Sequence, residues 1–287
     1  MEDFDSFNYV DDDDAEEVRV DPKVEDAKPK ILEMLKKVSV ATDRELKVRL
    51  EKKYFPWVVG RGLGLLIADG EVQKVGYPGR RAIRRSEVGA FYTLKGVAYE
   101  SVKDLIKSKK AVSEAIVSAL SGGSTASDHV EDLFLNAFAE LDFKFHGRNV
   151  SKFRGREVSH VHGKEPPNVD FVFERDKIAY GIDVKNWIRY EWDYRDEITS
   201  KVDVARQLGV VPFMIVRYAD KDIMWKGVIK KGGMVYRYGD LLLPSFYKSL
   251  ASEARRLLAY PVTAVEVLPK HKIEWLDKLH SRFVERK

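Results

Sequence analysis

The clearest alternation of apolar and polar residues lies between Val169 and Lys185. Apolar side chains at every second position predict two short strands, and the polar residues 175–177 between them predict a tight turn. Because side chains two residues apart project from the same face of a strand, Asp183 and Lys185 should share a face. If Asp170 pairs nearby, two carboxylates and one ammonium group meet at one end of this hairpin.

Elements on either side of the hairpin complete the expected C-terminal domain, 124–287. Apolar spacing predicts a helix with one buried face that begins at Ser127 or Asp128 and runs to about residue 141. After the hairpin, a helix over 198–208 precedes an apolar strand over 210–217, which predicts a right-handed parallel crossover and an α/β fold. The other expected elements are a strand around 143–145, a hairpin over 224–238, a helix over 244–258, a strand over 262–267 and a helix over 272–283.

The pattern over residues 27–96 predicts three helices followed by two short strands. Thr42 can cap the second helix, whereas Gly60, Gly62 and Gly64 weaken the third, over 56–68. This order resembles a winged helix-turn-helix, a small α+β DNA-binding domain. The resemblance implies that the third helix enters the major groove and that the wing arginines contact phosphates. These arginines are Arg80, Arg81, Arg84 and Arg85. The alternative is a helical protein-interaction module whose basic loop is merely solvated.

Charge is distributed unevenly along the chain. Residues 1–26 hold twelve acidic and two basic residues, a net charge of −10, so the remainder carries +14 within the total of +4. A segment so acidic cannot bury a core and is expected to be a disordered tail, which either keeps the protein soluble or shields its basic surface. A basic body suggests a polyanionic partner such as DNA.

The pattern over 96–120 predicts a long charged helix, and the run 121–124, Ser-Gly-Gly-Ser, predicts a linker. We therefore expect a connector helix and linker over 97–123. The absence of cysteine excludes disulfides, thiolate zinc sites and cysteine nucleophiles. Together with a content of 33% charged residues, the absence of cysteine also fits a protein from a heat-adapted source. The chain shows no membrane-spanning run, no secretory leader and no Gly-x-x-x-x-Gly-Lys-Ser/Thr phosphate loop. We therefore expect a cytoplasmic protein without a membrane partner or an ATP site of its own.

Asp170, followed on the next predicted strand by Asp183-Val184-Lys185, resembles the motif of the PD-(D/E)xK nuclease superfamily, which includes restriction endonucleases and Holliday-junction resolvases. Val169 stands where the motif has proline. The resemblance implies a restriction-endonuclease-like mixed sheet flanked by helices, and hydrolysis of DNA phosphodiester bonds that depends on Mg²⁺, with Mn²⁺ as a substitute.

The same resemblance assigns roles to individual residues. Asp170, Asp183 and the Val184 carbonyl would bind the metal ion, and Lys185 would hold the attacking water near the scissile phosphate. Glu131 matches an acidic helix residue that often joins the metal site in this family. The spacing of Asp128 and Glu131 also fits a capping box, which would make Glu131 a helix-start residue instead.

Other polar residues are candidates for contact with DNA. The phosphate-contact candidates between the predicted helix and the hairpin are Arg148, Lys152, Arg154 and Arg156. On the helix after the hairpin, Lys201 and Gln207 correspond to polar positions that approach DNA in relatives, or are simply exposed. The spacing of His160 and His162 would suit a metal site, but no third ligand lies nearby in the sequence. We therefore interpret them as surface histidines of a loop on the substrate side. The aromatic residues of 187–194 either pack in a core or stack on bases.

Three functions fit these observations. The first is a metal-dependent DNA endonuclease targeted by its N-terminal domain, with a homodimer plausible because cutting both strands usually takes two active sites. The second is a structure-selective nuclease such as a Holliday-junction resolvase. The third is a DNA-binding regulator with an inactive core, although the intact Asp170, Asp183 and Lys185 set counts against it.

Overall fold

The computed structural model describes residues 21–75, 89–121, 125–159, 167–186, 194–218 and 221–286. Most of the expected acidic tail, the basic loop with its four arginines, and the glycines of the expected linker lie outside these ranges. His160, His162 and the aromatic residues at 187–193 do so as well.

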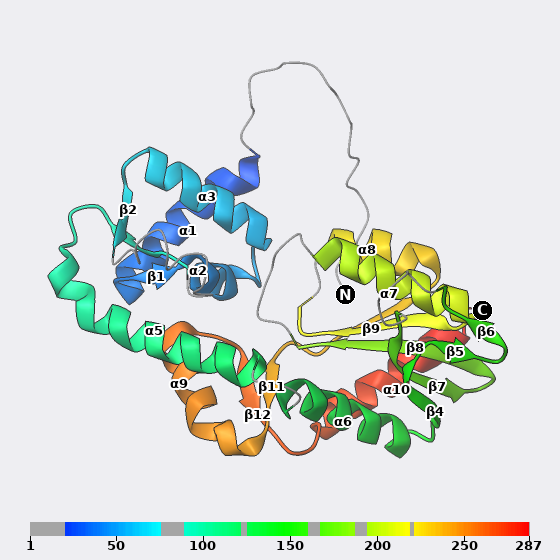
Figure 1. Cartoon of the computed structure of the whole chain (residues 1–287). Coiled ribbons are helices and arrows are strands. Elements are labelled where there is room, and N and C mark those ends of the chain that lie inside the picture. Colours follow the sequence, from blue (N-terminus) through cyan, green and yellow to red (C-terminus); the bar gives the residue numbers. More distant parts are fainter. Residues whose placement is uncertain are drawn as a thin grey trace, which may run out of the picture.

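Within the described residues, the N-terminal unit has three helices and a small antiparallel sheet (Figure 1). Its elements in chain order are α1 (Pro22–Val38), β1 (Ala41–Thr42), α2 (Asp43–Leu50), α3 (Pro56–Ala68), β2 (Val72–Val75) and β3 (Phe91–Leu94). The strand order is β1-β3-β2, so the two-residue strand between the first two helices pairs with the last strand.

Helix α1 begins earlier than the sequence pattern suggested. The Asp21 side chain accepts a hydrogen bond from the backbone N–H of Lys23 at 2.8 Å, and Pro22 occupies the first helical position. Val24 and Ala27 are fully buried in the core of the unit. The boundary expected after Asp26 is therefore wrong, because the acidic residues that precede it already belong to a packed helix.

Helix α3 forms in spite of its glycines. At Gly62 an added Cβ would lie 3.1 Å from the Ile31 side chain of α1 and 3.5 Å from the Val24 carbonyl oxygen. The missing side chain lets α3 lie close against α1, and this packing offsets the low helix propensity of glycine.

Helix α5 (Tyr99–Ser121) runs from the N-terminal unit toward the C-terminal part of the chain (Figure 1). Val112, Ile116 and Ala119 are buried against α9 (Lys248–Leu258) and the small parallel sheet β11 (Leu241–Leu243) and β12 (Val262–Ala264). Val48 of α2 packs in the same cluster, so the expected connector is a structural element that joins both parts of the chain.

The C-terminal part is built around a five-stranded mixed sheet of order β10-β9-β8-β7-β4. Its strands are β4 (Lys144–Val150), β7 (Val169–Arg175), β8 (Ile178–Lys185), β9 (Val211–Val216) and β10 (Met234–Arg237). Neighbours are antiparallel from β4 to β8 and parallel from β8 to β10. Helix α7 (Tyr194–Leu208) connects β8 to β9, so the expected α/β class and the parallel crossover are confirmed.

Helices cover both faces of this sheet (Figure 1). On one face, α6 (Thr125–Glu140) and α10 (Lys270–Val284) pack against an aromatic-rich core that includes Phe134, Phe138 and Ile273. On the other face, α7 contributes Ala205 and Leu208 to a separate cluster. Cover on both faces explains why the central strands β7, β8 and β9 are buried at most positions, whereas the edge strand β4 is largely exposed.

The hairpin at the centre of the sheet matches the expectation from alternation. Asp176 and Lys177 form the turn with positive φ angles of 52° and 63°, as a two-residue hairpin turn requires. Two other expectations are wrong. Helix α6 begins at Thr125 instead of Ser127 or Asp128, and β4 extends to Val150 instead of ending near 145.

The region after β9 also differs from the expected hairpin. Residues 221–227 form helix α8 (Lys221–Gly227), a short 3₁₀ turn follows at Ile229–Lys231, and only then does β10 run parallel to β9. A short apolar run fits a buried helix as well as a strand, and here the helix crosses back over the sheet.

Among the described residues, no helix combines the length and the apolar character needed to cross a bilayer.

Candidate active site

The two acidic motif residues meet at the end of the β7–β8 hairpin that lies away from its turn. In the antiparallel register of β7 and β8, Phe171 pairs with Ile182. The next position toward the open end of the hairpin therefore places Asp170 opposite Asp183. The backbone N–H of Val184 donates a hydrogen bond to Oδ2 of Asp170 at 2.8 Å. Asp170 is 9% exposed and Asp183 only 1%, which places two carboxylates in a largely dry environment.

Two lysines supply the opposite charge. Nζ of Lys185 lies 2.6 Å from Oδ1 of Asp183, as expected for residues on one strand face. Nζ of Lys201, from α7, lies 2.8 Å from Oδ2 of Asp183 and 3.6 Å from Oδ1 of Asp170. Lys185 also contacts Oε1 of Glu197 at 3.2 Å.

Lys201 is therefore a site residue that the sequence suggested only as a DNA contact. A signal for this position was present in the helix pattern. Lys201 lies between Ile198 and Ala205 at spacings of three and four residues, on the stripe of α7 that is buried against the sheet. A lysine on such a stripe needs a buried partner.

Glu131 lies beside this group on α6. Its side chain is 21% exposed, and its Oε2 is 3.8 Å from Nε of Arg148. Burial and then the charge of Asp170 raise the pKa of Glu131 to about 7. The capping-box alternative is wrong, because α6 begins at Thr125 and Asp128 is not its N-cap.

The electrostatics of the group are dominated by burial. Burial, and after it the charge of Asp183, raises the pKa of Asp170 above its ordinary value. Burial opposes the charged form of Lys185, but the carboxylates of Asp183 and Asp170 outweigh it and raise the pKa of that lysine. Lys185 thus stays protonated at neutral pH.

The donor set fits a hard cation. Mg²⁺ is commonly held by one or two carboxylates together with substrate phosphate, and Asp170 and Asp183 supply that number. In the described part of the chain, neither oxygen of Asp183 accepts a hydrogen bond of regular geometry, although lysine ammonium groups lie 2.6 and 2.8 Å away. Each of these buried oxygens therefore faces an ammonium group that a metal ion would have to displace.

Three ligands are not brought together. Over the ranges that the structure describes, no group of three His, Cys, Asp or Glu side chains is arranged to hold a metal ion. Glu131 does not complete a set of three with the two aspartates, and its role as a ligand stays a prediction. The same holds for the Val184 carbonyl.

Apart from Lys201, which lies in the site itself, Arg148 is a predicted DNA contact that borders the site. It lies on β4, its Nη2 is 2.5 Å from Oδ1 of Asp132, and its guanidinium lies over the Phe171 ring. Since its side chain is 38% exposed and borders Glu131, it is placed to meet a phosphate that approaches the carboxylates.

The other predicted contacts lie apart from the carboxylates. Lys152 pairs with Glu157 at 3.3 Å and Arg154 with Glu174 at 2.8 Å, in and next to the short hairpin of β5 (Lys152–Phe153) and β6 (Arg156–Glu157). Gln207 accepts a hydrogen bond from the Ser159 N–H at 3.4 Å at the far end of α7. Arg156 packs against Gly209. Arg80, Arg81, Arg84 and Arg85 lie outside the described residues.

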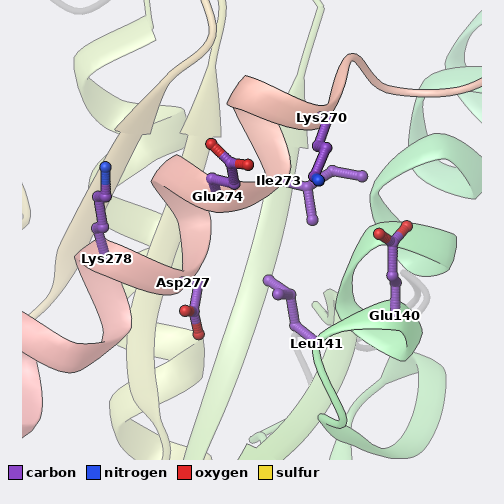
Figure 2. Close-up of a pocket in the computed structure, with 7 residues that line it drawn as sticks. All are labelled: Glu140, Leu141, Lys270, Ile273, Glu274, Asp277 and Lys278. Atoms are coloured by element: carbon purple, nitrogen blue, oxygen red, sulfur yellow. The ribbon is translucent and has the colours of Figure 1, made fainter.

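A cavity of about 370 Å³ lies elsewhere, between the end of α6 and α10 (Figure 2). Charges of both signs line it, among them Glu140, Lys270 and Asp277. Asp277 is 2.6 Å from Nη1 of Arg175, the last residue of β7. The cavity is therefore at the turn end of the hairpin and does not belong to the carboxylate site.

No protein-family model, curated protein or solved structure matched this chain. The functional argument therefore depends on the geometry of its own residues.

Proposed function

We propose that the protein is a metal-dependent DNA endonuclease of the PD-(D/E)xK kind, with an N-terminal winged-helix-like domain that brings it to DNA. The observation that carries this proposal is the meeting of Asp170 and Asp183 from adjacent strands with the ammonium groups of Lys185 and Lys201 in a nearly dry site. Buried charges of this density are costly to a fold, so they favour a functional role over a structural one.

The architecture supports the same proposal. An antiparallel hairpin that carries the acidic residues, followed by a helix and a parallel strand, is the arrangement expected of a restriction-endonuclease-like core. The helix before it presents Glu131 toward the acidic end of the hairpin, and charge from Asp170 acts on that residue.

The N-terminal unit supports a role in DNA binding. Three helices, a short strand between the first two, and a closing antiparallel pair of strands are the order expected of a winged helix. The four arginines of 80–85 fall in the segment between β2 and β3, where a wing would lie. The charge of +14 outside the first 26 residues agrees with a polyanionic substrate.

The proposed chemistry assigns a role to each group. Asp170 and Asp183 would hold Mg²⁺, which when bound lowers the pKa of water and neutralises phosphate oxygens. Lys185, protonated at neutral pH, donates hydrogen bonds to the attacking water and offsets the negative charge that develops on the phosphate. Glu131, with a pKa of about 7, is suited to accept a proton near neutral pH.

The decisive experiment is incubation with supercoiled plasmid and Mg²⁺ or Mn²⁺, with EDTA as the metal-free control. We expect nicking that requires the metal. Asp183→Asn should lower the rate by at least about 100-fold, the scale seen when one charge-stabilising group is lost, while DNA binding is retained.

Asp203→Asn is the matched control for this variant. Asp203 lies on α7, is 47% exposed on its side chain, and pairs with Lys231 instead of the site lysines. It should cleave like the unaltered protein. Full activity in Asp183→Asn, or no nicking with either metal, would contradict the proposal. Parallel assays on linear and branched DNA separate a duplex endonuclease from a structure-selective one.

A further inference from the structure

Lys201 occupies the position that a cation would take between the two aspartates. Its ammonium group lies 2.8 Å from Asp183, 3.6 Å from Asp170 and 2.9 Å from the carbonyl oxygen of Asn168. The side chain is 20% exposed, so the contacts lie in a region where charges are screened only weakly.

The charges of the site balance without a metal ion. Asp170 and Asp183 carry two negative charges when ionised, and Lys185 and Lys201 carry two positive charges. A divalent ion that binds both aspartates must compete with an ammonium group for the same oxygens, because like charges at this separation repel strongly.

We propose that Lys201 is an exchangeable internal cation. It neutralises Asp170 and Asp183 while no divalent ion is present, yields their oxygens when the ion binds, and then presents its charge to the phosphate of the bound nucleic acid. This inference rests on the proposed function and deepens it, since it assigns a positioning role to a lysine outside the recognised motif.

Both lysines have a second acceptor that makes such an exchange feasible. Lys201 keeps the Asn168 carbonyl oxygen at 2.9 Å, and Lys185 keeps Glu197 at 3.2 Å. Glu197 is 43% exposed on its side chain, so it can follow Lys185 toward solvent. Neither ammonium group loses all of its partners when the ion takes over the aspartates.

The exchange also changes the charge that the substrate meets. With the ion bound, the four side chains and the ion together carry a net charge of +2, whereas without it they are neutral. A phosphodiester is therefore attracted to the site only after the metal has bound, which would couple binding of the scissile phosphate to the presence of metal.

The test is metal binding in the absence of nucleic acid. Lys201→Met keeps the unbranched shape of the side chain, one atom shorter, and removes its charge. Compared with the unaltered protein, this variant should unfold at a lower temperature in EDTA and bind Mn²⁺ more tightly in calorimetry. The expected gain is about 5- to 150-fold, the usual size of a coupling between two ligands.

Lys231→Met is the matched control, because Lys231 also pairs with a carboxylate of α7, Asp203 at 3.1 Å, but lies outside the site. It should leave the affinity for Mn²⁺ unchanged. Lys201→Gln serves if the methionine variant does not fold, because an amide can still donate to Asn168 without carrying charge. It should show the same tighter binding.

Unchanged or weaker Mn²⁺ binding in the folded Lys201 variants overturns the inference, and Lys201 is then a fixed structural tie. If the unaltered protein still nicks plasmid with metal, only this inference fails. If neither the unaltered protein nor the variants bind Mg²⁺ or Mn²⁺, the proposed function fails with it.

Discussion

The partly buried carboxyl group of Glu131 makes stability depend on pH in a way that a single substitution can reveal. Glu131→Gln keeps the shape of the side chain and removes its charge. In the folded protein burial and the charge of Asp170 raise the pKa of this group to about 7, against 4.5 for an ordinary glutamate.

The sign and size of the effect follow from that difference. A carboxyl group whose folded pKa is raised contributes stability that is fully present below pH 4.5 and is lost as the pH rises through 7. The full shift corresponds to about 3.5 kcal/mol at roughly 1.4 kcal/mol per pKa unit. Because the Glu131 side chain is 21% exposed and borders Arg148, we expect about 1–2 kcal/mol.

The assay is urea unfolding in EDTA at a series of pH values from 4 to 8.5. Glutamine cannot ionise, so Glu131→Gln should match the unaltered protein at pH 4 and exceed its free energy of unfolding by about 1–2 kcal/mol at pH 8. Asp132→Asn is the control, since Asp132 is the adjacent residue of α6 but is 56% exposed on its side chain and also pairs with Arg148. It should show no comparable gain.

Parallel stability curves for the unaltered protein and Glu131→Gln across this range would refute the reasoning. Glu131 would then be well solvated, and its placement beside Asp170 in a dry site would be incorrect.

Two further predictions concern packing and buried charge. Gly181→Ala should lower the free energy of unfolding in urea by about 1–3 kcal/mol, because the added Cβ would lie 2.7 Å from a Val210 methyl group. Gly64→Ala is the control: its Cβ would meet nothing within 4 Å, so this variant should be neutral or slightly stabilising. Lys109→Met should cost about 1–3 kcal/mol in the free energy of unfolding, because it removes one of two cations that contact the fully buried carboxylate of Glu45, while Arg49 stays 2.8 Å away. An unchanged midpoint in thermal unfolding would contradict this.

Local patterns predicted the hairpin and the placement of its charged residues well. Alternation with period two placed Asp183 and Lys185 on one face, and the polar run at 175–177 placed the turn, because both depend on neighbours along the chain. The start of α1 is also predictable from the sequence, since Asp21 followed by Pro22 is a common helix-start signal.

Features that depend on packing were harder to predict. Lys201 joins the site because α7 crosses the sheet, and its partners lie 18 and 31 positions earlier in the chain. The apolar run that contributes to α8 predicts a strand as readily as a helix, because a few apolar residues fit either element until their place in the fold is known. The continuity of α3 depends on its contact with α1, which helix propensity does not include.

Two ion pairs tie the N-terminal unit to the rest of the chain. Lys109 of α5, whose side chain is 2% exposed, contacts both carboxylate oxygens of Glu45 at 2.8 Å. Arg217 directly follows β9, and its side chain, 1% exposed, lies 3.3 Å from Glu51. Arg217 is bonded through its backbone N–H to the carbonyl oxygen of Lys185.

Deleting the chain up to the end of α3 would therefore withdraw a carboxylate from each of two buried cations. One of these cations is a direct neighbour of the strand end that carries the chemistry. The N-terminal unit is thus a part of the scaffold that keeps the acidic hairpin in place, and not a detachable adaptor.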